Sequence, residues 1–302
     1  MTVIQSHDHS FAELDSLVPH APVGRRGFIA GSLGAGFAAA VAPTGPLLAQ
    51  VITTDRTGLT EGMIRIPASG AELPVYRAQP QGRVGLATIL VVHEVFGVHE
   101  HIQDVARRFA KAGYQAIAPE LFFRQPEPGE RATAAERFEK VVSKVTDTQV
   151  MADLDACADW AAANGGDGKR LAVTGFCWGG RITWMYAAHQ PRLRAGVAWY
   201  GRLTSATSAV TPTHPHDVAE QLHAPVLGLY GGADQGIPLT TVEEMQLRLD
   251  GGTAASKASV FHVYPDAPHA FHADYRPSYR KDAADDGWKR ALAWFAEHGV
   301  TG

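Results

Sequence analysis

The feature that most constrains the fold is the alternation of short apolar runs with longer amphipathic segments. Residues 86–92 form a continuous apolar run, which is typical of a strand buried on both faces of a parallel sheet. Residues 102–110 carry apolar side chains at helical spacing, and Gly113 follows as a helix stop. The alternation continues, with strands expected at 114–118, 171–174, 195–199, 226–230 and 258–264 and helices at 150–163, 181–189, 241–249 and 283–298. This pattern predicts an α/β fold whose sheet is mostly parallel, with helices on both faces.

The segment after residue 49 is predicted to be one domain, residues 50–302. Residues 63–66 and 73–77 are interpreted as a leading hairpin, and no repeat or Gly/Ser linker divides the chain after that hairpin. Residues 124–130 and 201–217 are expected to be irregular surface loops near the mouth of a site. The composition, 45% hydrophobic and 19% charged, is that of a globular chain. A net charge of −4 provides no basic stripe for nucleic acid.

The first 49 residues are interpreted as an export signal. Residues 28–54 contain no charged side chain, and Arg25 and Arg26 immediately precede them. The adjacent arginines and the mildly apolar stretch resemble a twin-arginine (Tat) signal, the bacterial route for proteins exported folded. The alternative is a membrane anchor, but Pro43 interrupts the stretch before the ~20 apolar residues that a span needs. We therefore expect the Tat machinery as a partner, cleavage near Ala49, a periplasmic or secreted location and no stable span in the mature protein.

The segment with the clearest chemistry is Gly175-Phe176-Cys177-Trp178-Gly179, which follows a predicted strand and opens a predicted helix. Gly-x-Cys-x-Gly is the nucleophile-elbow pattern with cysteine in place of serine. The glycines relieve crowding at a sharp turn, and the helix start supplies N–H groups and a partial positive charge that favour a thiolate. The alternative is a buried structural cysteine at a strand end.

Two further residues follow predicted strands. Asp234 lies just after the strand at 226–230, and His269 lies after the strand at 258–264. The order nucleophile, acid, histidine is that of the α/β-hydrolases, and parallel sheets gather their sites at the carboxyl ends of strands. His269 is predicted to take the thiol proton and to pass a proton to the leaving group, while Asp234 fixes the imidazole tautomer. The alternatives are a turn-forming aspartate and a surface histidine.

From about residue 61 to residue 300 the chain resembles the dienelactone hydrolase (carboxymethylenebutenolidase) family, which has the α/β-hydrolase fold. The matching segments are 93–97 (His-Glu-Val-Phe-Gly), 118–122 (Ala-Pro-Glu-Leu-Phe), 175–180 (Gly-Phe-Cys-Trp-Gly-Gly), 232–234 (Gly-Ala-Asp) and 269–271 (His-Ala-Phe). The resemblance implies that Cys177, Asp234 and His269 form the catalytic triad. It also implies hydrolysis of a small-molecule ester, lactone or thioester through a covalent acyl-enzyme.

The resemblance implies supporting roles for three more residues. Glu94 is the carboxylate that in the family contacts the resting cysteine and holds it unreactive until substrate arrives. The backbone N–H groups of Val95 and Trp178 are implied as the oxyanion hole. The family's substrate-carboxylate arginine is expected four residues after the histidine, where this chain has Ala273, and Arg276 is the nearby substitute. The second arginine has no match at the family spacing, although Arg131 and Arg137 lie in that region.

The remaining histidines and the second cysteine are interpreted as structural. The clusters at 99–101 and 214–216 lack the His-Glu-x-x-His spacing, so they are taken as loop histidines, with no metal and no cofactor expected. Cys157 is taken as a helix core residue, although a disulfide with Cys177 in an oxidising compartment would consume the nucleophile. Two other functions remain open: a non-catalytic exported binding protein on a hydrolase scaffold, and a thiol redox sensor using Cys177.

Overall fold

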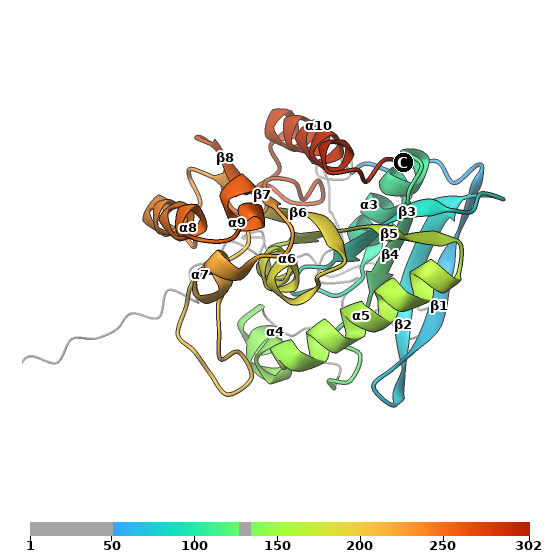
Figure 1. Cartoon of the computed structure of the whole chain (residues 1–302), viewed down its shortest axis with the longest axis horizontal. Coiled ribbons are helices and arrows are strands. Elements are labelled where there is room, and N and C mark those ends of the chain that lie inside the picture. Colours follow the sequence, from blue (N-terminus) through green and yellow to red (C-terminus); the bar gives the residue numbers. More distant parts are fainter. Residues whose placement is uncertain (1–50, 127–133) are drawn as a thin grey trace, which may run out of the picture.

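The computed structural model describes residues 51–126 and 134–302, so the predicted export signal at 1–49 lies outside the described residues. Within these ranges, eight strands form a single sheet in the order β1-β2-β4-β3-β5-β6-β7-β8 (Figure 1). The strands are β1 (Leu59–Ala68), β2 (Ala71–Pro80), β3 (Leu86–Val92), β4 (Gln115–Pro119), β5 (Gly166–Phe176), β6 (Leu193–Trp199), β7 (Val226–Gly231) and β8 (Val260–Tyr264). The helices are α3 (Glu100–Lys111), α4 (Ala134–Lys140), η2 (Val142–Lys144), α5 (Asp147–Ala163), α6 (Trp178–His189), α7 (Pro215–Val218), η3 (Ala219–Gln221), α8 (Leu239–Gly251), α9 (Ala254–Ala258) and α10 (Lys281–Glu297).

The sheet is mixed, with an antiparallel edge and a parallel body. Strands β1 and β2 form the predicted hairpin, and β2 pairs antiparallel with β4. From β4 to β8 every pairing is parallel. The prediction of a mostly parallel α/β sheet is therefore confirmed. Because the parallel strands run the same way, their carboxyl ends share one edge, where the loops that follow them meet.

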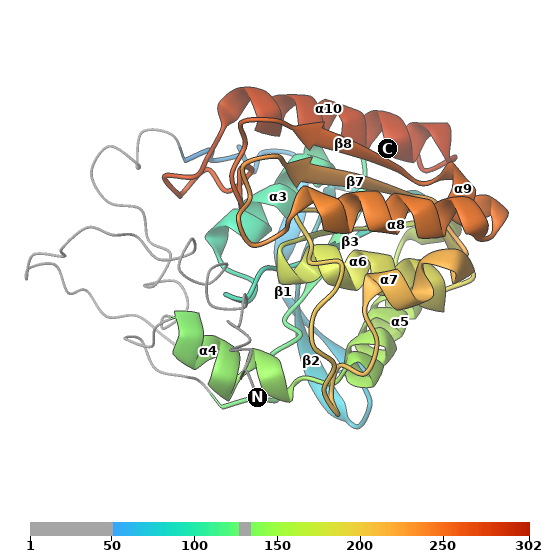
Figure 2. The same cartoon turned by 90° about the vertical axis from the view of Figure 1, so that its left-hand side faces the viewer.

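Helices cover both faces of the sheet, as predicted. Figures 1 and 2 show α3 and α10 on one face and α5 and α6 on the other. Every residue of β3 is buried, which explains why its sequence is apolar on both faces. Burying each large aliphatic side chain of this kind stabilises the folded state by ~1.5–3 kcal/mol compared with leaving it exposed to water.

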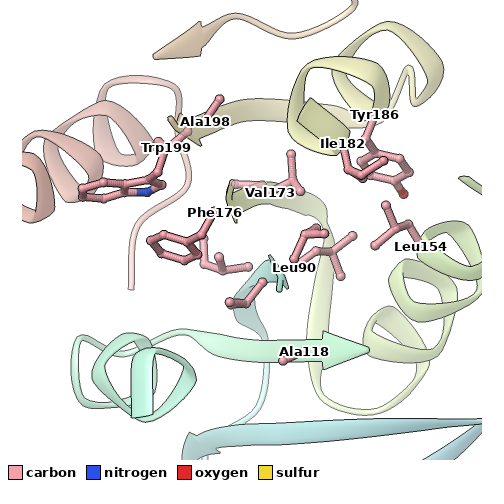
Figure 3. Packing of buried hydrophobic residues seen from close by; sticks show 14 of the residues in the cluster. Leu90, Ala118, Leu154, Val173, Phe176, Ile182, Tyr186, Ala198 and Trp199 are labelled. Carbon is pink, nitrogen blue, oxygen red and sulfur yellow. The ribbon is translucent and has the colours of Figure 1, made fainter. Parts of the chain in front are cut away.

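The core fills the space on each side of the sheet. Figure 3 shows Leu154 of α5 close to Ile182 and Tyr186 of α6 on one side. The rings of Phe176 and Trp199 stack with centroids 5.4 Å apart, and Trp199 also packs against α10, where a Cβ added at Gly287 would lie 2.7 Å from its indole. These two aromatic residues end β5 and β6, so they fix the strand ends from which the site is built.

Several local predictions differ from the structure. Strand β5 begins at Gly166 rather than at residue 171, because Gly166 also pairs with Leu86 of β3, with a register shift before the pairing resumes at Leu171. Helix α7, Pro215–Val218, overlaps the end of residues 201–217, for which the sequence predicts an irregular loop, and α4 has no counterpart among the predicted helices. Both helices are short, and short helices carry too little periodicity to be predicted from sequence. Part of the first predicted loop, residues 127–130, lies outside the described residues.

Candidate active site

The turn between β5 and α6 has the geometry of a nucleophile elbow. Cys177 lies in the left-handed region, with φ 55° and ψ −114°. A Cβ added at Gly175 would lie 2.1 Å from the carbonyl oxygen of Gly179, so a larger residue there would prevent the turn from closing. A non-glycine residue at this φ is strained, and such strain is typical of functional positions.

The backbone around Cys177 holds the thiol at the start of a helix. Its N–H donates to the carbonyl of Trp199 on the neighbouring strand at 3.0 Å, and its own carbonyl accepts from Gly180 and Arg181 at 2.9 and 3.2 Å. Trp178 is the first residue of α6, so its N–H has no acceptor within the helix. The positive end of the α6 dipole therefore lies beside the sulfur, where it favours a thiolate and any oxygen anion that forms nearby.

His269 and Asp234 come from the loops that follow β8 and β7, and both side chains are buried. The Nδ1 of His269 lies 2.7 Å from Oδ2 of Asp234, whose Oδ1 accepts the N–H of Gly236 at 2.9 Å. Burial alone would lower the pKa of His269, but the charge of Asp234 and the interactions with Cys177, a hydrogen bond included, raise it well above its usual value. The structure thus brings the three residues of the predicted triad together in a chain from Cys177 to His269 to Asp234.

Glu94 is fully buried in the loop after β3. Its Oε2 accepts a hydrogen bond from the hydroxyl of Tyr275 at 2.6 Å and lies 3.3 Å from Nε2 of His99, while its Oε1 has no hydrogen-bond partner among the described residues. Burial alone would raise the pKa of Glu94, but the hydrogen bond with His99 and the charge of Arg276 outweigh it and hold the pKa below its usual value. The carboxylate is therefore ionised, and Tyr275 and His99 both contact its Oε2.

The two predicted oxyanion-hole segments adjoin. A Cβ added at Gly179 would lie 2.4 Å from the carbonyl oxygen of Val92 and 2.7 Å from that of His93. The start of α6 therefore lies directly against Val92, the last residue of β3, and His93, which is two residues before Val95. Val95 is buried and Trp178 is half-buried.

Arg276 is buried in the same region as Glu94. Its guanidinium carbon lies 4.8 Å from the ring centroid of Phe96 and 5.1 Å from that of Tyr275. Ala273, which takes the position of the expected family arginine, is also buried. Arg137 lies buried on α4, and Arg131 lies outside the described residues. The structure thus places the buried guanidinium of Arg276 close enough to Glu94 for the two charges to attract.

Tyr200, directly after β6, is a further residue beside the histidine of the predicted triad. Its ring packs edge-on against His269, with centroids 5.2 Å apart, and its backbone has a φ of 39°. The hydroxyl is buried without a hydrogen-bond partner among the described residues. Burial and the charge of Glu94 raise its pKa well above the usual value, so it is a neutral donor. One signal in the sequence could have identified Tyr200. It directly follows β6, a strand that pairs with β5, and β5 leads into the nucleophile.

Two histidines that the sequence analysis assigns to loops belong to helices in the structure. His101 belongs to α3 rather than to a loop, and its Nδ1 lies 3.1 Å from Oδ1 of Asp274. His216 likewise belongs to α7. Within residues 51–126 and 134–302 no group of three or more His, Cys, Asp or Glu side chains is arranged to hold a metal ion.

Neither cysteine forms a disulfide. Cys157 is buried on α5, and Cys177 is buried at the elbow, so no disulfide joins them. Burial raises the pKa of the Cys157 thiol, and the charge of Asp153 adds to this effect. Cys157 is therefore unreactive, in contrast to a thiol at a helix start beside a histidine.

The sequence profile of the dienelactone hydrolase family matches residues 73–299. The chain belongs to the dienelactone hydrolase family. It is 54% identical over 291 residues to a protein of Methylorubrum extorquens named "putative carboxymethylenebutenolidase", covering 96% of this chain and 98% of that protein. An Escherichia coli K12 protein of the same name is 51% identical over 265 residues, covering 87% and 96%.

The same family appears among solved structures. The crystal structure of a "putative dienelactone hydrolase" from Klebsiella pneumoniae superimposes with a TM-score of 0.76 at 54% identity, covering 79% of this chain and 99% of that one. This dienelactone hydrolase family protein therefore has the α/β-hydrolase fold and is a hydrolase. Among the helices that the structure describes, none has both the length and the apolar character to cross a bilayer.

Proposed function

We propose that this protein hydrolyses a small carboxylic ester, lactone or thioester by nucleophilic attack of Cys177. The observation that carries the proposal is the buried chain of contacts from the thiol through His269 to Asp234 at the carboxyl edge of the sheet. A thiol beside an imidazole that is oriented by a carboxylate is the general arrangement of an activated nucleophile. Family membership supports the reaction class.

The reaction proceeds in two halves. Cys177 Sγ forms a bond to the substrate carbonyl carbon, its proton passes to Nε2 of His269, and the carbonyl π electrons move onto oxygen. The N–H groups of Val95 and Trp178 stabilise that oxygen anion. The intermediate collapses, the leaving alcohol or thiol takes the proton from His269, and an S-acyl enzyme remains. Water then attacks the acyl carbon and gives a proton to His269. The second intermediate collapses, the C–S bond breaks, the carboxylic acid leaves, and His269 returns the proton to the sulfur.

Two buried charges support substrate control of this reaction. Glu94 places a negative charge near the thiol, and a like charge disfavours the thiolate until a bound substrate changes the contacts of the carboxylate. Arg276 provides a buried cation beside Phe96, which suits a substrate that carries a carboxylate and an apolar or conjugated body. A lactone acid has both features.

The test is intact-mass spectrometry after incubation with a panel of lactones and activated esters, on wild type and His269→Ala. We expect an adduct on Cys177 that carries the whole mass of a lactone but only the acyl part of an ester, because a lactone's leaving group stays attached. Cys157→Ala should form the same adduct and Cys177→Ala should not. Hydrolysis of the esters with no adduct at Cys177 would contradict the proposed nucleophile. A panel that gives neither adduct nor turnover would favour a non-catalytic binding protein.

We also propose that the chain is exported folded, through the twin-arginine pattern at Arg25 and Arg26. Replacing both residues with lysine keeps the positive charge but removes the paired guanidinium groups that the pattern requires. The variant is expected to remain in the cytoplasm, as measured by fractionation and immunoblotting of the bacterial host, whereas an Arg56→Lys control should be exported normally. Undiminished export of the double variant would refute this proposal.

A further inference from the structure

His93, directly after β3, is fully buried and contacts both segments of the proposed oxyanion hole. We propose that His93 is a positioning residue that fixes the Glu94–Val95 peptide so that the Val95 N–H faces the carbonyl oxygen of the substrate. The inference rests on the proposed function and adds a residue to it. It concerns only how the oxyanion hole is held, since His93 itself touches neither the nucleophile nor its base in this proposal.

The hydrogen bonds of His93 assign its tautomer. The backbone N–H of Leu121 donates to Nε2 at 3.1 Å, so this nitrogen carries a lone pair and no proton. The proton is therefore on Nδ1, which lies 2.6 Å from the carbonyl oxygen of Glu94 and donates to it. His93 thus ties the loop after β4 to the loop after β3 as a neutral ring.

The bond to the Glu94 carbonyl also sets the direction of the next N–H. None of the described peptide bonds is cis, and in a planar trans peptide the C=O and the N–H point in opposite directions. Fixing the carbonyl of Glu94 on one side therefore fixes the N–H of Val95 on the other. Without this bond the peptide plane would be free to rotate about its flanking single bonds, and the donor would lose its alignment.

The same ring supports the second donor. It stacks on the indole of Trp178 with centroids 5.5 Å apart and planes 18° apart, while Phe122 packs edge-on at 4.6 Å. The loop is held from the β4 side as well, because Oε2 of Glu120 accepts the N–H of Val98 at 2.7 Å. One buried ring thus contacts the peptide group that carries one proposed donor, through the Glu94 carbonyl, and the side chain of Trp178, which carries the other.

The test compares His93→Leu, which removes both hydrogen bonds, with His93→Asn, whose amide nitrogen takes the place of Nδ1. On p-nitrophenyl acetate we expect His93→Leu to lower kcat about ten- to hundredfold with little change in KM, because a misaligned donor acts only in the transition state. His93→Asn should recover most of the loss. An aryl trifluoromethyl ketone, which forms an oxygen anion on adding the thiol, should bind His93→Leu more weakly by a similar factor.

Alkylation of Cys177 by iodoacetamide separates positioning from general damage, because substitution at a saturated carbon creates no oxygen anion. Its rate should be unchanged in both His93 variants. Thr88→Val is the matched control, since it removes another buried hydrogen bond of β3, 3.0 Å long to Gln115, and should leave kcat unchanged. Equal losses of hydrolysis and alkylation in His93→Leu, full activity in that variant, or an Asn variant as slow as the Leu variant would each overturn the inference. Hydrolysis that survives Cys177→Ala would overturn the proposed function and this inference together.

Discussion

Replacing Cys177 with alanine is expected to lower kcat for activated esters by about 10⁴-fold or more, because no other group is placed to form the acyl bond. The remaining rate reflects binding and the oxyanion hole alone. Steady-state hydrolysis of p-nitrophenyl acetate by the purified variant measures the effect. Alanine keeps the Cβ at the strained elbow, so the midpoint of thermal unfolding should change little.

Two companion variants sharpen this result. Cys157→Ala removes the other cysteine, which is buried on α5, and should retain full activity if it folds. Cys177→Ser should show slow but measurable turnover, because a serine hydroxyl loses its proton less readily than a thiol. Wild-type rates in Cys177→Ala would exclude the proposed nucleophile, whatever the other variants do.

Asp234→Asn is expected to lower kcat about 10³- to 10⁴-fold without loss of the fold. The N–H of Gly236 donates to Oδ1 of Asp234, so the oxygen of an asparagine would take that position. Its NH₂ group would then face Nδ1 of His269, which would have to accept rather than donate. The imidazole proton would move to Nε2, and the ring could no longer take the thiol proton.

The pH dependence of alkylation is the additional measurement for this variant. Since Asp234 raises the pKa of His269, the asparagine variant should also lose the stabilised imidazolium that accompanies a thiolate, and iodoacetamide should react more slowly near neutral pH. Asp266→Asn, an exposed carboxylate in the loop that carries His269, is the control and should behave as wild type. A wild-type kcat in Asp234→Asn would remove the aspartate from the mechanism.

The parts of the site that are local in sequence could be predicted from it. The elbow is recognisable because glycines at fixed spacing, a preceding apolar strand and a following helix all fall within one short segment. Asp234 and His269 could be found because each follows a strand, and parallel strands bring their carboxyl ends together. The same logic predicts the alternating fold and the hairpin of β1 and β2.

The contacts that orient Glu94 could not be predicted in this way. Tyr275 donates to a carboxylate 181 residues away along the chain, and no periodicity or spacing links the two positions. The role of His93 depends on the direction of a single peptide group, which only the packed structure defines. Helix α4 and the early start of β5 escape prediction because short or polar segments form secondary structure through tertiary contacts rather than through their own pattern.

The order of the site residues along the chain has a consequence for biosynthesis. Cys177 leaves the ribosome well before His269, because strands β6, β7 and β8 separate the elbow from the histidine. Until those strands dock, the sulfur lacks the histidine that takes its proton, so it is mostly protonated and lacks the activation of the folded site. Reactivity is thereby switched on by the last stage of folding.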